Sequence, residues 1–266
     1  MAVPTSPEAN KLPYTWRVVG ASVRGVSHFK SDLPCQDAHV WREIPGGAVV
    51  LAVADGAGSA PLSQLGAARA AVSATEWVAE LMKGTWPETD EDWLGLLAAC
   101  LETAHEAVNL AAKKRKAPVR DLATTLILVV ATPRVVAAVQ VGDGCAVVLD
   151  SGQTLVPVTA PQRGEFVNET LFFTSPDYLK AAQFKIWHGL VAGVAILSDG
   201  LQMLALQLPD ATPHAAFFQP LFRMTTEHQD MREAEFQLRS FLQSDRITSR
   251  ADDDLTIVMA TLHRTP

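Results

Sequence analysis

The chain has 266 residues, of which 48% are hydrophobic and 19% are charged, and its formal net charge is −7. This composition is typical of a folded globular protein with a sizeable core and excludes a disordered chain. The acidic balance argues against nucleic acid as the main partner, because binding to a phosphate backbone needs clustered basic residues. The three cysteines form no CxxC pair, so no disulfide framework is expected.

Residues 1–13 contain three prolines and few apolar residues, which predicts a flexible N-terminal arm ahead of a single domain over residues 14–266. The arm lacks the basic and hydrophobic regions of a signal peptide. No apolar segment approaches ~20 residues without charges or turn-forming residues, so no membrane span is predicted. We therefore expect a cytoplasmic protein with no membrane partner.

The first half of the chain predicts short strands followed by a pair of helices. Strands are expected at residues 16–23, 38–43 and 48–54, with a loop over 24–34. Helical spacing of apolar residues then runs from Pro61 to Gly84 and from Glu91 to about Ala111, with Thr89 or Asp90 as the second N-cap. Both helices carry an apolar stripe, so they should pair over one face of a sheet.

The second half is rich in predicted strands and ends with another helix pair. A meander is expected over 124–131, 135–141, 145–150 and 153–158, and a hairpin over 184–188 and 193–198. Residues 160–180 are irregular, which indicates a functional or disordered segment. Helices at 215–223 and 231–242 precede a last strand at 255–262. Two strand-rich blocks, each with a helix pair, predict an α+β fold with two sheets face to face and helices outside.

Acidic residues recur where the predicted strands end. Asp55, Asp143 and Asp199 each follow an apolar strand and each precede a glycine, whereas Asp253 lies just before the last strand. An Asp-Gly pair alone is also a common hairpin turn. Carboxylates that converge on one place repel one another unless a cation lies between them. Carboxylate oxygens without a Cys or His cluster favour Mg²⁺ or Mn²⁺ over Zn²⁺.

Short motifs spread along the chain occur in the order found in one known family. They are Cys35-Gln36-Asp37-Ala38, Ala54-Asp55-Gly56-Ala57-Gly58, Ala123-Thr124-Thr125-Leu126, Val141-Gly142-Asp143-Gly144, Leu197-Ser198-Asp199-Gly200 and Asp253-Asp254-Leu255-Thr256. Through them the chain resembles the bacterial-type branch of the protein phosphatase 2C family of metal-dependent Ser/Thr phosphatases, over roughly residues 16–262. Each motif is weak alone, and the shared order makes the resemblance specific.

The resemblance implies a four-layer αββα sandwich of two mostly antiparallel sheets with helix pairs outside. It also implies hydrolysis of phosphoserine and phosphothreonine by a water that bridges two Mn²⁺ or Mg²⁺ ions. Asp55 would be shared by both ions, Asp199 and Asp253 would complete the first, and Asp37 and the Gly56 carbonyl would hold the second. Asp55, Asp199 and Asp253 are thus the expected catalytic residues. Asp143 matches the position that supports a third metal.

The chain departs from the family pattern at several positions. Gln36 stands where an acid is typical, Asp32 occupies the place of a phosphate-binding arginine, and Ala57 replaces a histidine found in many eukaryotic members. Positive charge for the substrate phosphate could then come from His28, Lys30 or Arg24, and His28 or Lys30 is the preferred candidate. The resemblance also places a variable flap over 160–180, with a recurring Asn168-Glu169-Thr170 element.

Three functions remain open from the sequence. The first is a phosphatase that acts on a phosphorylated protein, such as the target of a cognate Ser/Thr kinase, as a monomer. The second is a catalytically weak or inactive binding module of the same fold, suggested by Gln36 and by the missing arginine. The third is a metal-dependent hydrolase of small phosphorylated metabolites.

Overall fold

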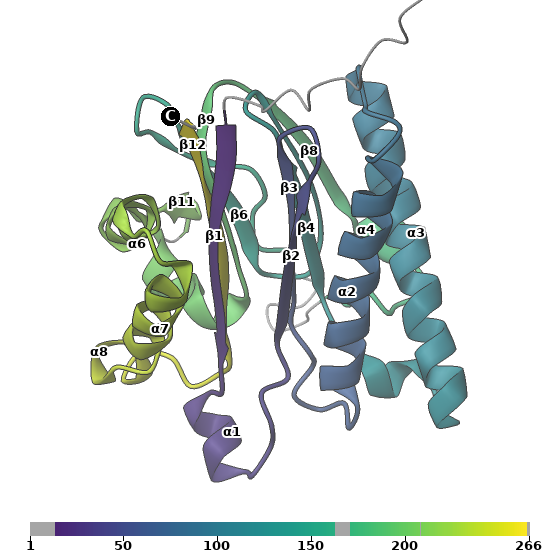
Figure 1. The fold of residues 1–266 in the computed structure, drawn as a ribbon. Helices are drawn as coiled ribbons and strands as arrows, with labels where there is room; N and C mark the ends of the chain where they lie inside the picture. The colour runs from purple at the N-terminus through teal and green to yellow at the C-terminus, as the bar shows by residue number, and fades with distance from the viewer. Residues whose placement is uncertain (1–13, 163–170, 208, 265–266) are drawn as a thin grey trace, which may run out of the picture.

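The computed structural model describes residues 14–162, 171–207 and 209–264. The expected arm over 1–13 and the expected flap element at 168–170 lie outside these residues. Figure 1 shows four layers: a helical layer, two sheets face to face, and a second helical layer. The expected α+β architecture, an αββα sandwich, is confirmed.

The first sheet has the strand order β2-β3-β4-β5-β8, and all its neighbours are antiparallel. Its strands are β2 (Ala38–Ile44), β3 (Ala48–Ala54), β4 (Leu126–Ala131), β5 (Val135–Val141) and β8 (Gln183–His188). Every residue of β3 and β4 is buried, which explains the unbroken apolar runs in the sequence. In β3, Val50 and Ala52 face the helices, while Val49 and Leu51 face the other sheet.

The second sheet has the order β1-β12-β9-β6-β7 and is also antiparallel. Its strands are β1 (Tyr14–Val23), β12 (Leu255–Arg264), β9 (Val191–Leu197), β6 (Cys145–Asp150) and β7 (Leu155–Pro157). Its outer face packs on α6 (Ala215–Glu227) and α7 (Met231–Leu242), through Phe218, Phe222 and Leu238.

Helices α2 (Ser63–Leu81) and α3 (Asp90–Arg115) pair over the first sheet, as expected from their apolar stripes. Alanines on the buried face of α2, among them Ala67 and Ala74, let it lie close to the sheet. Thr89 caps α3: its side chain accepts from Asp92 N, and the Asp92 carboxylate accepts from Thr89 N. This confirms the first of the two expected caps.

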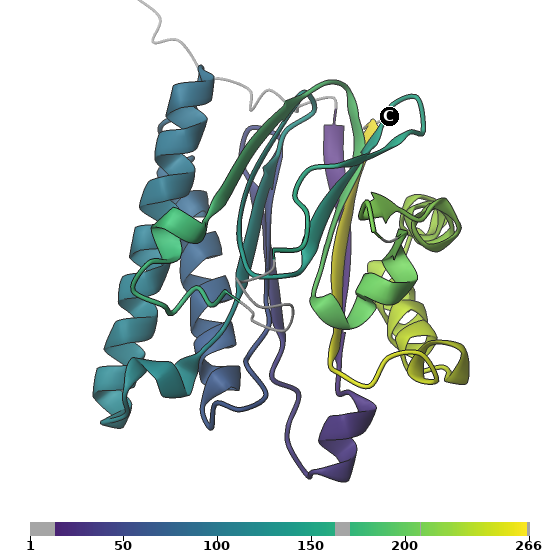
Figure 2. The same ribbon diagram turned by 180° about the vertical axis from the view of Figure 1, so that it is seen from behind.

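Two predicted strand connections are wrong. The expected four-strand meander is split, since β4 and β5 belong to the first sheet and β6 and β7 to the second. The expected hairpin around Gly189 is also absent: β8 and β9 lie in different sheets, and Figure 2 shows the chain arching from one to the other. Turn residues mark where a strand ends, but they do not determine which sheet receives the next strand.

The predicted loop over 24–34 contains a short helix, α1 (Val26–Lys30), at one end of the sandwich. Five residues carry too little periodicity to reveal it in the sequence. Short elements complete the described fold. These are η1 (Val119–Leu122), α4 (Tyr178–Ala181), η2 (Asp199–Leu201), α5 (Gln202–Ala205), β10 (Leu206–Gln207), β11 (Thr212–Pro213) and α8 (Asp245–Thr248).

Candidate metal centre

The ends of β3, β5 and β9 and the start of β12 come together at the end of the sandwich where α1 lies (Figure 1). Strand pairing fixes this arrangement, because Leu197 at the end of β9 pairs with both Cys145 of β6 and Ile257 of β12. It follows that three segments lie next to one another: the turn before β6, the residues after β9 and the residues before β12. These segments carry three of the expected ligands, Asp143, Asp199 and Asp253.

Three carboxylates meet closely. Asp55, Asp143 and Asp199 each offer an oxygen, and the three oxygens lie within 4.8 Å of one another. Asp37 and Asp253 are near enough to act electrostatically on this group: Asp37 raises the pKa of Asp55, and Asp253 raises that of Asp199. The structure thus brings together all five aspartates selected from the sequence.

Three acids of this cluster, Asp37, Asp55 and Asp199, resist ionisation. Burial, and then the neighbouring charges, raise the pKa of Asp55 well above its usual value. Burial also raises the pKa of Asp37 to about 7, and that of Asp199 to about 6. At neutral pH these groups can all be charged at little cost only if a cation offsets their repulsion. A cluster of carboxylate oxygens of this kind suits Mn²⁺ or Mg²⁺.

Hydrogen bonds to the start of β4 fix the backbone at Asp55. Asp55 N donates to Thr125 Oγ1 at 3.0 Å, and the Asp55 carbonyl accepts from Thr125 N at 2.8 Å and Thr124 Oγ1 at 2.9 Å. The next residue must be glycine, because a Cβ on Gly56 would lie 2.7 Å from the Gln36 carbonyl oxygen. The expected role of the Gly56 carbonyl as a ligand remains a prediction.

Ser198 is a polar contact that the sequence pattern did not single out. Its Oγ donates to Asp37 Oδ2 at 2.7 Å and accepts from Thr256 N at 3.1 Å. The hydroxyl therefore links the loop before β2 to the strands that carry Asp199 and Asp253. The only sequence feature that could have indicated a role for Ser198 was its position directly before Asp199.

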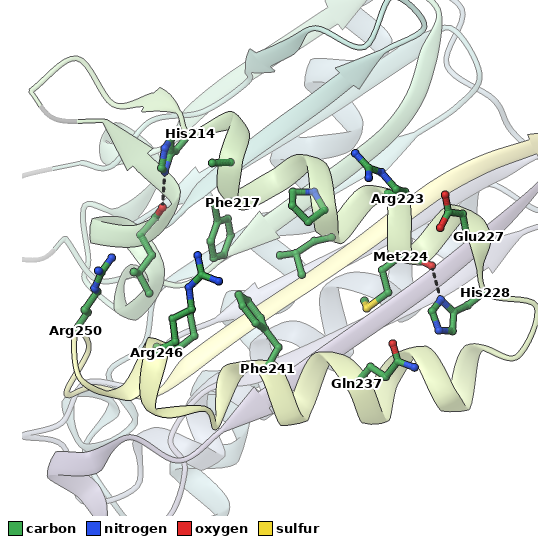
Figure 3. A pocket seen from close by; sticks show the side chains of 15 residues that line it. His214, Phe217, Arg223, Met224, Glu227, His228, Gln237, Phe241, Arg246 and Arg250 are labelled. Atoms are coloured by element: carbon green, nitrogen blue, oxygen red, sulfur yellow. Dashed lines mark hydrogen bonds between the residues drawn. The ribbon is translucent and has the colours of Figure 1, made fainter.

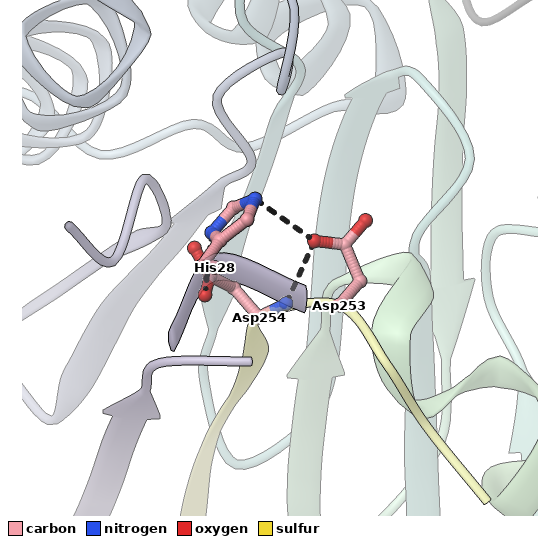
Figure 4. Close-up of side chains that lie close together, drawn as sticks. All are labelled: His28, Asp253 and Asp254. Atoms are coloured by element: carbon pink, nitrogen blue, oxygen red, sulfur yellow. Dashed lines mark hydrogen bonds and ion pairs between the residues drawn. The ribbon is translucent and has the colours of Figure 1, made fainter. Parts of the chain in front are cut away.

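Asp253 and Asp254 have different environments (Figure 4). The Asp253 side chain is 58% exposed, whereas Asp254 is buried and accepts from Gly25 N and Gln36 N, both at 2.6 Å. Asp254 thus ties the loop around α1 to the start of β12. The motif register pointed only to Asp253, and the position of Asp254 beside an apolar strand was the one hint of its burial.

The two residues expected to bind the substrate phosphate, His28 and Lys30, differ in their exposure to solvent. His28 is 7% exposed, with Nδ1 3.0 Å from Asp254 Oδ1 and Nε2 3.7 Å from Asp253 Oδ1 (Figure 4). Lys30 is exposed at the end of α1. Asp32, in the place of the family arginine, is exposed and lies 3.4 Å from Arg24.

A separate hollow lies beside α6 and α7, on the helix-covered face of the second sheet (Figure 3). It has a volume of about 590 Å³ and apolar walls that include Phe217, Leu221 and Phe241 from α6 and α7. None of the clustered aspartates lines it. It is therefore separate from the aspartate cluster, and none of the carboxylates proposed to hold the cations faces it.

A protein-family model described as protein phosphatase 2C matches residues 24–243. The chain belongs to this family. Serine/threonine-protein phosphatase 3 of Escherichia coli (strain K12) is 33% identical over 254 residues, which cover 92% of this chain and 98% of that protein.

Solved structures show the same fold. A bacterial serine phosphatase superposes with a TM-score of 0.65 at 12% identity, covering 95% of this chain and 100% of that one. The serine/threonine phosphatase Stp1 from Staphylococcus aureus superposes with a TM-score of 0.62 at 12% sequence identity, covering 93% of this chain and 95% of that one. The catalytic domain of the serine/threonine protein phosphatase PstP, in complex with two manganese ions, superposes with a TM-score of 0.60 at 18% sequence identity. The match covers 94% of this chain and 99% of that one.

Family membership and the acid cluster together define the activity. The protein is a metal-dependent serine/threonine-protein phosphatase that uses Mn²⁺ or Mg²⁺ and acts on phosphoproteins. Among the described residues no helix is both long and apolar enough to cross a bilayer.

Proposed function

We propose that this protein phosphatase 2C member hydrolyses phosphoserine and phosphothreonine at the aspartate cluster, with Asp55, Asp199 and Asp253 as its catalytic carboxylates. The observation that carries the proposal is the convergence of Asp55, Asp143 and Asp199 within 4.8 Å, on segments far apart in the sequence. A fold without a bound cation gains nothing from such repulsion.

The proposed roles are those that the family resemblance implies, and the proximity of the five aspartates supports them. Asp55 lies among the other acids and would be the ligand shared by two ions. Asp199 and Asp253 would complete one site, and Asp37 and the Gly56 carbonyl would complete the other. Asp143 is the candidate for a third ion. When bound, the cations would offset the charge of the phosphate and favour deprotonation of the attacking water.

The chain itself positions these ligands and limits their access to water. Ser198 fixes the Asp37 carboxylate by donating to Oδ2, and Thr125 fixes the backbone of Asp55. Burial keeps the local dielectric constant low, which strengthens the attraction between the ligands and a cation. The open side of the cluster is at Asp253, the exposed member, and a protein-bound phosphoester would approach there.

The finer features belong to the same proposal. We expect a single-domain, cytoplasmic monomer whose substrate is the target of a cognate Ser/Thr kinase, with no nucleic-acid partner. The three cysteines are free, which suits a reducing compartment. A small-metabolite phosphatase or a weakly active binding module would retain the same acid cluster, so activity must separate them.

The direct test is hydrolysis of a phosphothreonine peptide and of p-nitrophenyl phosphate, each with Mn²⁺ or with EDTA. We expect Mn²⁺-dependent turnover of the peptide. Asp55→Asn and Asp199→Asn should each lower kcat/KM about 100-fold or more, since each removes a ligand charge. Asp252→Asn, in the exposed residue next to Asp253, is the matched control and should keep full activity.

Each alternative has its own outcome. Mn²⁺ binding without hydrolysis of either compound would support the binding module instead. Turnover of the small ester alone would indicate a metabolite phosphatase. Equal activity in the Asp55→Asn variant and the unmodified protein would contradict the proposed site.

A further inference from the structure

Gln36 and His28 lie beside the aspartate cluster and have polar atoms that the carboxylate centre does not use. The Gln36 side chain is 3% exposed, and its Oε1 has no hydrogen-bond partner among the described residues. A buried acceptor left unpaired costs about 1–3 kcal/mol, so this oxygen calls for a donor or a cation.

Both groups border the same open space. Apart from its two chain neighbours, the described residues would place two heavy atoms within 4 Å of a Cβ on Gly58: Gln36 Oε1 and His28 Nε2, each at 3.9 Å. The glycine thus leaves a gap that an amide oxygen and an imidazole nitrogen both face. Asp253 reaches the same region, since its Oδ1 lies 3.7 Å from His28 Nε2 (Figure 4).

Asp254 determines which nitrogen of His28 is available. Its buried carboxylate is held by the backbone N–H groups of Gly25 and Gln36, and it lies 3.0 Å from His28 Nδ1. This contact is not aligned as a hydrogen bond, but the charge beside Nδ1 favours a proton there and leaves the lone pair on Nε2. Metal-binding histidines commonly have a carboxylate beside the other ring nitrogen in this way.

The surroundings of Nε2 favour a cation over a phosphate oxygen. A phosphate here would stand next to the Asp253 carboxylate and would face two atoms, Nε2 and Gln36 Oε1, that can only accept. A cation would satisfy all three groups. Two ligand atoms about 2.1 Å from one ion lie roughly 3–4 Å apart, which agrees with the 3.7 Å between His28 Nε2 and Asp253 Oδ1.

We propose that His28 Nε2, the Asp253 carboxylate and Gln36 Oε1 bind a divalent transition-metal ion beside Gly58, with Asp254 orienting the imidazole. This inference rests on the proposed function for the role of Asp253 as a ligand. It gives His28 a different role from the phosphate contact that the sequence suggested. An imidazole ligand favours Mn²⁺, Fe²⁺ or Zn²⁺ over Mg²⁺, so this site should discriminate between ions that an all-oxygen centre accepts.

Nitrogen coordination can be detected without measuring activity. Mn²⁺ is added to the metal-free full chain, and pulsed electron paramagnetic resonance measures nitrogen couplings to the bound ion. We expect a ¹⁴N signal that changes when the protein carries ¹⁵N-histidine. His28→Gln should abolish it and weaken one class of Mn²⁺ binding about 10-fold or more, while Mg²⁺ binding changes less.

His39→Gln is the matched control, because His39 Nδ1 is hydrogen-bonded to Ser22 and the ring lies outside the proposed site. It should keep the nitrogen signal. The isotope experiment on the unmodified protein needs no variant, so a His28→Gln protein that fails to fold leaves the inference testable.

The outcomes separate this inference from the proposed function. Bound Mn²⁺ with no histidine coupling, or a coupling that persists in His28→Gln, would overturn the inference and leave the carboxylate centre intact. A histidine coupling in a protein that hydrolyses no phosphoester would support the inference and contradict the proposed function. No bound Mn²⁺ at all would overturn both.

Discussion

At the scale of single residues, the acids of the centre depend on neighbours that are not ligands. Asp37 has its pKa raised to about 7 by burial, and hydrogen bonds from the Ser198 and Thr256 side chains oppose this rise. These donors favour the charged carboxylate that a cation needs. The Ser198 hydroxyl is therefore expected to position Asp37, a proposed metal ligand.

Ser198→Ala tests this role. Loss of a donor to Asp37 should make ionisation harder and weaken Mn²⁺ binding about 10–100-fold, as is typical when a partner of a metal ligand is removed. Calorimetric titration with Mn²⁺ measures the change. Ser240→Ala, at an exposed position of α7, should bind Mn²⁺ normally. Unchanged affinity in Ser198→Ala would show that Asp37 needs no such support.

At the scale of elements, close backbone contacts place the helices and loops around the centre. A Cβ on Gly66 of α2 would lie 2.1 Å from the Leu122 carbonyl oxygen. Leu122 is the last residue of η1, and the threonines that contact Asp55 follow it closely in the chain. A Cβ on Gly95 of α3 would have no atom of the described residues within 4 Å beyond its own helix backbone. The two helical glycines thus differ in the space that a methyl group would have.

Opposite effects on stability follow for alanine at the two sites. Gly66→Ala should destabilise the protein by about 1–3 kcal/mol, because Leu122 must move. Gly95→Ala should stabilise it by roughly 0.5–1 kcal/mol, since alanine has the higher helix propensity. Urea unfolding of the metal-free proteins gives both values. Equal effects at the two sites would mean that the close contact with Leu122 is not a constraint.

Some elements could not be predicted because their partners lie far away in the sequence. Gly142-Asp143-Gly144 has the composition of a hairpin turn, yet it carries the chain from one sheet to the other. Conversely, the apolar strands and the helix pairs follow from local periodicity and were predicted. The acids at the strand ends could be located from sequence for the same reason. The difference between Asp253 and Asp254 arises from contacts with Gly25 and Gln36, which lie far away in the sequence, so the only local hint was that Asp254 adjoins an apolar strand.

At the scale of the whole molecule, the acid cluster links stability to pH. In the metal-free protein the pKa values of Asp37 and Asp199 are raised to about 7 and about 6, so the folded state holds protons that the unfolded state has lost. Stability then falls as the pH rises from about 4 to about 7. A cation replaces these protons, so its stabilising effect should grow over the same range.

Thermal unfolding at pH 5 and pH 7.5 tests this linkage. With EDTA, Tm should be lower at pH 7.5; with Mn²⁺, the difference should shrink or reverse. Asp55→Asn removes one of the repelling acids and should raise the metal-free Tm at pH 7.5 by several degrees. A metal-free Tm that rises between the two pH values would contradict the electrostatic account.

The most direct measurement is anomalous diffraction at the manganese edge from crystals grown with Mn²⁺. Because the aspartates from both sheets form one centre, manganese peaks should appear about 2–2.3 Å from the carboxylate oxygens of Asp55 and Asp199. Ordered side chains at both positions with no manganese peak between them would contradict the account.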